Sequence, residues 1–268
     1  MPQTDRVFAG SVPVLYDHYL GPLIFEPYAA DLAARVAAGA PRSILETAAG
    51  TGILTHALAR ALPEAAITAT DLNQPMLDLA AAKGGAERVI WRHADAQNLP
   101  FDDGSFEVVV CQFGAMFFPD KGMAYREARR VLKPSGRFLL SVWDRISEND
   151  LAAVVTDIVA ASVSADAPPF LARIPHGHHD VGVIDSDLRD AGFTRVAVET
   201  VTKRSRAPSP HDPAIGFCQG TPMRGEIETG APGRLTEVTE AAAAAIAAKF
   251  GDGTVDAKMQ AIVVVAEI

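Results

Sequence analysis

Two carboxylates that end successive apolar stretches are the residues of this sequence best placed to bind a ligand. Glu46 closes the stretch Ile44–Glu46, and Asp71 closes the stretch Ile67–Asp71. Between them, Gly50-Thr51-Gly52 opens onto a helical run, which gives a unit of strand, tight turn and helix. Glycines let the backbone turn sharply and let a ligand approach it, while the first amides of a helix attract polar groups. This pattern predicts a site for a nucleotide-type cofactor.

The spacing of Asp71 sharpens that prediction. Asp71 lies 19 residues beyond Gly52, where a second strand would place an acceptor for ribose hydroxyls. A nicotinamide-dependent oxidoreductase is the alternative of the same architecture. Its fingerprint requires a third glycine where this sequence has Thr55, and no Ser, Tyr and Lys constellation of the short-chain dehydrogenase type follows. The sequence therefore favours another nucleotide-type cofactor.

Composition limits the class of partner and compartment. The net charge of -9 argues against a general nucleic-acid binder, since phosphate binding requires clustered Lys and Arg. The densest basic cluster, Lys203-Arg204-Ser205-Arg206, is interpreted as solvated residues at a strand end. Cys111 and Cys218 form no CxxC pair, and the run Ala241–Ala248 is too short to span a membrane. We expect a cytoplasmic protein without membrane insertion or a signal peptide.

The elements that must position these residues alternate along the chain. We predict a helix at 27–38, strands at 44–46, 67–71, 89–93, 106–112 and 137–143, and helices at 54–62, 74–83 and 121–132. Continuous apolar strands such as 107–111 are typical of a parallel sheet covered on both faces. The alternation with short connections predicts a doubly wound α/β fold.

The final third of the sequence has a different pattern. We predict a helix at 150–163, a loop at 165–180, a short helix at 184–190, and strands at 194–206 and 259–268. The segment 207–256 lies between these two strands in the sequence and contains a predicted helix at 235–250. Because a long insertion between adjacent strands is usually functional, we expect it to cap a pocket at the carboxyl edge of the sheet.

The N-terminal residues 1–20 are amphipathic and are followed by Gly21-Pro22. A short helical arm that ends there is expected. It either covers the core or lines a substrate pocket with Tyr16, His18 and Tyr19.

Five segments in order carry a family resemblance: Ile44–Gly52, Ala69–Leu77, Asp95–Phe101, Ser105–Gln112 and Arg130–Arg137. With them the chain resembles the class I S-adenosylmethionine-dependent methyltransferases, in the subgroup similar to the ubiquinone and menaquinone biosynthesis enzymes. The resemblance implies a Rossmann-like, mostly parallel seven-stranded sheet whose last strand is antiparallel. It also implies a single domain over 1–268, with an N-terminal arm at 1–40, a cofactor-binding core at 41–145, further sheet and helices at 146–206 and 257–268, and a helical cap at 207–256.

The resemblance also implies S-adenosylmethionine as cofactor and a set of contacts to it. These are Glu46, Ala48, Gly50, Gly52, Asp71, Leu72, Met76, Asp95, Ala96 and Gln112. Asp71 would accept from both ribose hydroxyls, Met76 would pack on the adenine, and Gln112 would lie near the sulfonium. The first loop glycine of the family is replaced here by Ala48, as in the quinone subgroup.

Methyl transfer from a sulfonium is an in-line displacement, in which alignment and suitable dipoles are the main tasks of the protein. A general base is needed only if the acceptor must first lose a proton. The candidates stand in His176-Gly177-His178-His179-Asp180. This segment could bind a metal, enter a helix with Asp180 as its cap, or place His178 or His179 in a pocket. No metal site is predicted.

A small-molecule methyl acceptor is expected, methylated on O, N or C. Its predicted pocket is lined by apolar and aromatic side chains, namely Tyr16, Tyr19, Phe113, Met116, Phe117, Phe217 and Met223. Phe117 could equally be a core residue. A cofactor-binding sensor or assembly protein without catalysis remains the alternative function, and a homodimer is possible.

Overall fold

The computed structural model describes residues 10–163 and 168–268. They form two compact units. The sheet unit comprises residues 28–142, 179–201 and 262–268, and the helical unit comprises 10–27, the described part of 143–178, and 202–261. The segment 207–256 lies wholly within the helical unit. Its predicted role as a cap, and the predicted single domain with its boundaries, stay predictions.

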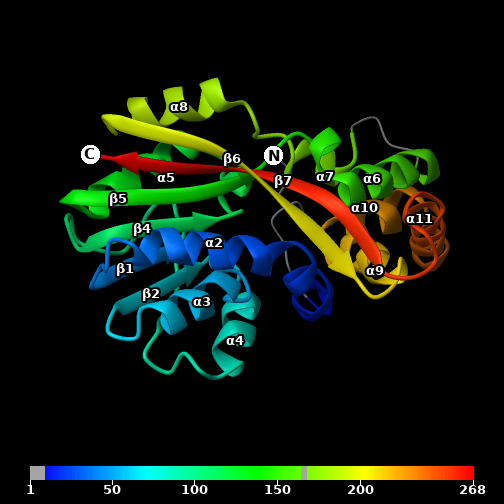
Figure 1. The fold of residues 1–268 in the computed structure, drawn as a ribbon, viewed down its shortest axis with the longest axis horizontal. Helices are drawn as coiled ribbons and strands as arrows, with labels where there is room; N and C mark the ends of the chain where they lie inside the picture. The colour runs from blue at the N-terminus through cyan, green and yellow to red at the C-terminus, as the bar shows by residue number, and fades with distance from the viewer. Residues whose placement is uncertain (1–9, 164–167) are drawn as a thin grey trace. The chain divides into compact units, whose positions relative to one another are not determined.

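One seven-stranded sheet runs through the fold, in the order β3-β2-β1-β4-β5-β7-β6. The strands are β1 (Ser43–Thr47), β2 (Ala66–Asp71), β3 (Ile90–His93), β4 (Phe106–Gln112), β5 (Leu132–Trp143), β6 (Arg195–Ala207) and β7 (Val255–Glu267). The first five pair in parallel, and β7 runs opposite to its neighbours (Figure 1). The predicted fold class is confirmed.

The chain reverses its direction of strand addition at β1. This strand pairs with β2 on one side and with β4 on the other, so that Ile44 lies beside both Ile67 and Val108. After β1 the chain continues into a helix on one face of the sheet, and after β4 it continues into a helix on the other face. Such a switch point is where open α/β sheets bind their ligands.

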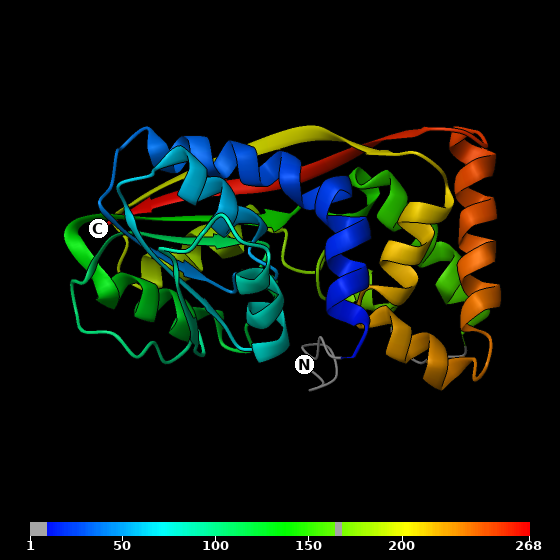
Figure 2. The same ribbon diagram turned by 90° about the horizontal axis from the view of Figure 1, so that it is seen from below.

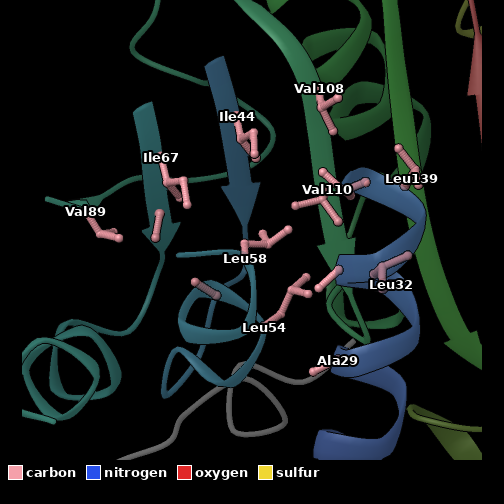
Figure 3. Packing of buried hydrophobic residues seen from close by; sticks show 14 of the residues in the cluster. Ala29, Leu32, Ile44, Leu54, Leu58, Ile67, Val89, Val108, Val110 and Leu139 are labelled. Atoms are coloured by element: carbon pink, nitrogen blue, oxygen red, sulfur yellow. The ribbon is translucent and has the colours of Figure 1, made fainter. Parts of the chain in front are cut away.

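Helices α2 (Glu26–Ala37) and α3 (Ile53–Ala61) cover one face of the sheet. Figure 3 shows Leu32 of α2 and Leu54 and Leu58 of α3 packed against strand residues such as Ile44 and Val110. These five side chains are at most 2% exposed, and burying each stabilises the fold by roughly 1.5–3 kcal/mol. This layer fixes α3 and the loop before it against β1.

The opposite face carries α5 (Lys121–Val131) and α8 (Val181–Asp190), and Figure 2 shows α2 and α5 on opposite sides of the strands. The rings of Tyr125 and Phe138 lie 5.8 Å apart, and those of Phe138 and Phe193 lie 5.9 Å apart. Helix α4 (Gln74–Ala82) lies against β2 and β3. Both faces of the central strands are thus buried, as their continuous apolar sequence predicts.

Helix α8 begins at a side-chain cap. Asp180 Oδ1 accepts hydrogen bonds from the amides of Gly182 at 2.8 Å and Val183 at 3.1 Å. We expect Asp180→Ala to lower the free energy of unfolding by about 1 kcal/mol, because two helix N–H groups lose their acceptor. Urea denaturation measures this, and Asp180→Ser, which keeps an acceptor, should lose less. Equal losses for both variants would contradict the capping role.

The helical unit contains α1 (Val12–Leu15), the π-helical segment η2 (Tyr16–Phe25), α6 (Asp150–Ser162), α7 (Phe170–Arg173), α9 (His211–Gln219), α10 (Met223–Gly230) and α11 (Leu235–Phe250). Helix α11 packs against α9 and α6, and η2 packs against α9. The predicted helix at 235–250 is confirmed. Two short 3-10 turns, η3 (Ala115–Phe117) and η4 (Ile146–Glu148), complete the elements.

The predicted end of the N-terminal arm at Gly21-Pro22 is wrong. The chain continues through Pro22 in η2 and directly into α2, and the amide of Glu26 donates to the carbonyl of Gly21, five residues earlier. Proline disrupts an α-helix because it lacks an N–H and its ring meets a preceding carbonyl. The wider π turn accommodates it.

The predicted loop at 165–180 also contains a helix, α7, in its described part from residue 168. Phe170 and Leu171 drive it, since they are 1% and 3% exposed. Pro169 stands just before the first turn, where proline is tolerated. In the described residues no helix is long and apolar enough to cross a membrane.

Candidate functional site

The loop after β1 is held from β2. The amide of Ala49 donates to the carbonyl of Thr70 at 2.9 Å, and the amide of Gly50 donates to Asp71 Oδ2 at 2.8 Å. Within this loop Ala48, Gly50 and Gly52 all have left-handed backbones, with φ of 53°, 56° and 76°. Ala48 is strained there because it carries a Cβ atom. The loop is therefore fixed in one shape by main-chain bonds and by Asp71.

Asp71 turns its carboxylate toward this loop. Oδ1 accepts from the amide of Asn73 at 2.7 Å, while Oδ2 takes the amide of Gly50. Burial raises the pKa of Asp71, and the N–H bonds of Asn73 and Gly50 act against that shift. Oδ1 also accepts a longer bond, at 3.4 Å, from the side-chain amide of Asn73, so the second lone pair of Oδ2 is the one left for a ligand hydroxyl. Asp71 therefore anchors the loop and has capacity left for a ligand.

Glu46 is the second buried acid of the site. It is 1% exposed, and its Oε2 accepts from Thr55 Oγ1 at 2.6 Å. Burial raises the pKa of Glu46 to about 8, helped by the nearby charge of Asp71, while the Thr55 bond opposes the shift. As long as no cation binds beside it, the carboxyl group of Glu46 is therefore neutral over much of the physiological pH range. Thr55 was not predicted as a site residue, although it stands in the first turn of the helix after the glycine loop.

The two loop glycines have different surroundings. A Cβ at Gly50 would have no described atom within 4 Å, whereas one at Gly52 would lie 2.8 Å from Trp91 and 2.9 Å from Ala80. Gly52 is thus required by packing whatever binds, and its cofactor contact stays a prediction. Thr51 Oγ1 is buried and has no hydrogen-bond partner among the described residues. An open position at Gly50 beside an unsatisfied hydroxyl fits a polar ligand.

The opposite wall is the end of β4. Gln112 is the last strand residue and lies in register with Ser141 of β5. Phe113 follows with φ of 52°, and its amide donates to the carbonyl of Ser141 at 3.0 Å. Its ring packs edge-on against Tyr28, with 5.3 Å between ring centres. A bulky residue in the left-handed region marks stored strain, which is typical of functional sites.

The predicted adenine contacts lie at the ends of β2 and β3. Met76 is 3% exposed and Leu72 is 42% exposed. Asp95 Oδ1 accepts from the amide of Gln97 at 2.9 Å, and Ala96 is buried. The amide of Ala94 donates to the carbonyl of Asp71 at 3.1 Å, which joins this turn to the end of β2. The adenine contacts themselves stay predictions.

The histidine segment does not gather around one centre. Among the described residues no group of three or more His, Cys, Asp or Glu side chains could hold a metal. His176 Nδ1 lies 2.7 Å from the carbonyl of Asp144, His178 is 9% exposed, and Asp180 caps α8. The helix-entry interpretation is confirmed, and the pocket roles of His178 and His179 stay predictions.

The predicted pocket residues are divided between the units. Phe113, Met116 and Phe117 belong to the sheet unit, and Tyr16, Tyr19, Phe217 and Met223 belong to the helical unit. Within the helical unit Tyr16 stacks on Phe25 at 4.8 Å, and Tyr19 meets His18 edge-on at 4.7 Å. Their role in binding an acceptor stays a prediction.

Comparison with known proteins found a matching family model, a similar protein and two solved structures of the same fold. A family model described as a methyltransferase domain matches residues 45–140. The ubiquinone/menaquinone biosynthesis C-methyltransferase of Ectopseudomonas mendocina is 34% identical over 174 residues, which covers 59% of this chain and 68% of that protein.

Two solved structures share the fold. The cyclase SpnF aligns with a TM-score of 0.61 and 19% identity over 99% of this chain and 96% of its own. A Haemonchus contortus phosphoethanolamine N-methyltransferase, solved with S-adenosylhomocysteine, aligns with a TM-score of 0.61 and 14% identity over 98% of this chain and 59% of its own. At these identities the likeness concerns the fold alone.

Proposed function

Because this chain belongs to the S-adenosylmethionine-dependent methyltransferases, we propose where it binds the cofactor and which class of acceptor it methylates. The family fixes the reaction as direct, in-line methyl transfer to a small molecule. The cofactor-binding residues proposed here lie at or follow the carboxyl ends of β1, β2, β3 and β4. The acceptor class proposed is a hydroxylated ring that is methylated on carbon.

The observation that carries the cofactor site is the orientation of Asp71. Its carboxylate accepts the Gly50 amide at 2.8 Å, so it faces the glycine loop. The second lone pair of Oδ2 suits one ribose hydroxyl, and the other hydroxyl would replace the long bond from the Asn73 side chain on Oδ1. Glu46 is the proposed partner of the cofactor's ammonium group, because a buried carboxyl becomes favourably charged beside a cation. The open side of Gly50 allows close approach to the main chain.

The remaining contacts follow the order of the strands. Met76 and Leu72 are proposed to contact the adenine ring, with Asp95 accepting from its amino group and the Ala96 amide donating to it. Gln112, at the end of β4, is proposed to lie beside the reacting sulfonium. When bound, the cofactor supplies an electrophilic methyl group, and the two buried acids attract its positive charge.

The acceptor class rests on the relative, which is named a C-methyltransferase of ubiquinone and menaquinone biosynthesis. We propose a quinol or related hydroxylated arene as acceptor, since a ring hydroxyl makes the neighbouring carbon nucleophilic. Phe113, Met116 and Phe117 offer an apolar and aromatic lining in the sheet unit. His178 and His179 are retained as proposed pocket residues.

Nucleic acid is not proposed as a substrate. The net charge is -9, and within the basic cluster Arg204 and Arg206 both pair with Asp256 of β7. A cytoplasmic location and a homodimer are proposed on the sequence alone.

Incubation with S-adenosylmethionine and 1,4-naphthalenediol tests the acceptor class. We expect S-adenosylhomocysteine to form and the new methyl group to appear on a ring carbon, as read by mass spectrometry and NMR. Tyramine, an amine with one ring hydroxyl, serves as the comparison acceptor. Methylation on oxygen or nitrogen would contradict the proposed class, and cofactor binding without turnover on broad acceptor pools would favour the non-catalytic alternative.

A further inference from the structure

Ala48 and Gly114 touch each other across the switch point. Ala48 follows β1 and carries a Cβ atom at φ of 53°. Gly114 follows β4 and Phe113. A Cβ atom built on Gly114 would clash with the Ala48 Cβ, at a distance well below 3.0 Å. The methyl group of Ala48 therefore occupies the space that a side chain at residue 114 would need.

Both partners belong to loops whose positions matter to the site. The next amides after Ala48 are those of Ala49 and Gly50, which bind Thr70 and Asp71. Gly114 follows Gln112 and Phe113, and the Phe113 amide is tied to β5 through Ser141. A shift of the loop after β1 would therefore move the groups bonded to Asp71, and a shift of the loop after β4 would move Gln112.

Backbone strain supports the same interpretation. Ala48 and Phe113 are two non-glycine residues with left-handed backbones, and each follows one of the two strands that flank the switch point. Such conformations persist only where the surroundings enforce them. Gly114 itself has φ of -99°, so it is glycine for lack of space and not for its backbone angle.

We propose that Ala48 and Gly114 form a matched steric pair that sets the distance between the loop after β1 and the loop after β4. This inference rests on the proposed cofactor site. In that site the pair positions the two loops, so that Gly50 and Asp71 stay at a fixed distance from Gln112. A side chain at residue 114 pushes the two loops apart, and a misplacement of about 1 Å can cost on the order of 100-fold in rate.

Calorimetric titration with S-adenosylhomocysteine tests the pair through a ligand contact. Gly114→Ala is expected to weaken its affinity at least about tenfold, by displacing the loop that carries Gly50. Adding Ala48→Gly vacates the contested space, so the double variant should return to within about threefold of the native chain. The return is incomplete because Cys111 Sγ would still lie 2.9 Å from the new methyl group.

Gly136→Ala is the matched control. Its Cβ would meet Leu132 at 2.8 Å and a carbonyl at 2.9 Å, which is a comparable clash in the sheet unit near the beginning of β5. We expect it to lower the melting temperature without changing the affinity for S-adenosylhomocysteine at a temperature well below the melting transition. Circular dichroism at that temperature checks that every variant is folded.

Three results would decide against the pair. Native-like affinity in Gly114→Ala, an equal loss in Gly136→Ala, or no recovery in the double variant would each overturn it while leaving the cofactor site intact. If Gly114→Ala does not fold, recovery of folded, ligand-binding protein in the double variant supports the pair, and failure to recover overturns it. A native chain that binds no S-adenosylhomocysteine would overturn the proposed cofactor site as well.

Discussion

Asp71→Ala is expected to weaken the binding of S-adenosylhomocysteine by roughly 30- to 1,000-fold. The proposed site gives this carboxylate two ribose hydroxyls, and each charge-assisted bond contributes about 1 to 2 kcal/mol. The variant also frees the amides of Gly50 and Asn73, which Asp71 holds at 2.8 Å and 2.7 Å. Calorimetric titration of the folded variant measures the total loss.

A ligand lacking one hydroxyl separates the two contributions. The native chain should bind the 2′-deoxy analogue about tenfold more weakly than S-adenosylhomocysteine, whereas Asp71→Ala should bind both alike. Asp78→Ala makes the same change in net charge on the exposed side of α4, where Asp78 contacts Gln74 at 2.8 Å. It should bind like the native chain. Discrimination against the analogue that survives in Asp71→Ala would place the ribose elsewhere.

The strands of the sheet could be predicted because the local sequence of each strand is enough to identify it. The predicted strand at 106–112 agrees with β4 residue for residue, since a short run rich in β-branched valines and bounded by turn residues favours a buried strand over a helix. The helices of the helical unit were harder to predict from the sequence. α9 and α10 contain Gly216, Gly220 and Gly225 in or beside them, which indicate turns when taken alone.

Tertiary packing explains those glycines. A Cβ on Gly216 would lie 2.7 Å from Leu20 of η2, so the residue is small because two helices approach closely there. Nothing within α9 itself encodes this contact, which joins residues distant in sequence. The helices form because Phe217, Met223 and Ile227 are buried, and burial outweighs a weak local propensity.

The site shows the same division. The spacing of glycines and acids along the chain predicted the tight turn after the first strand and the acid at the end of the second, since both belong to one strand-helix-strand unit. Thr55 as the partner of Glu46, and the left-handed backbone at Phe113, depend on the three-dimensional arrangement of side chains and neighbouring strands. Residue spacing alone carries no signal for either.

Glu46→Gln should remove a large dependence of stability on pH. The folded protein raises the pKa of Glu46 from an ordinary 4.5 to about 8. Between these values the unfolded chain has lost a proton that the folded protein keeps, so the free energy of unfolding falls as pH rises through this window. The loss amounts to at most about 5 kcal/mol, at about 1.4 kcal/mol for each unit.

Urea denaturation from pH 5 to pH 9 measures this dependence. Near pH 5 the native chain and Glu46→Gln are both neutral at residue 46 and should differ little in stability. Near pH 9 the variant should be more stable by several kcal/mol, because it has no buried carboxylate to ionise. Glu64→Gln makes the same change at an exposed position and should follow the native profile. Parallel profiles for the native chain and Glu46→Gln would show that the carboxyl ionises normally in the fold.

The same proton links stability to cofactor binding. An ammonium group beside Glu46 favours the carboxylate, so binding of S-adenosylhomocysteine at pH 7 should release close to one proton from the native chain. Titration in two buffers of different ionisation enthalpy counts that proton, and Glu46→Gln should release none. A native chain that released no proton would separate the ammonium group from this acid, even if Asp71 still held the ribose.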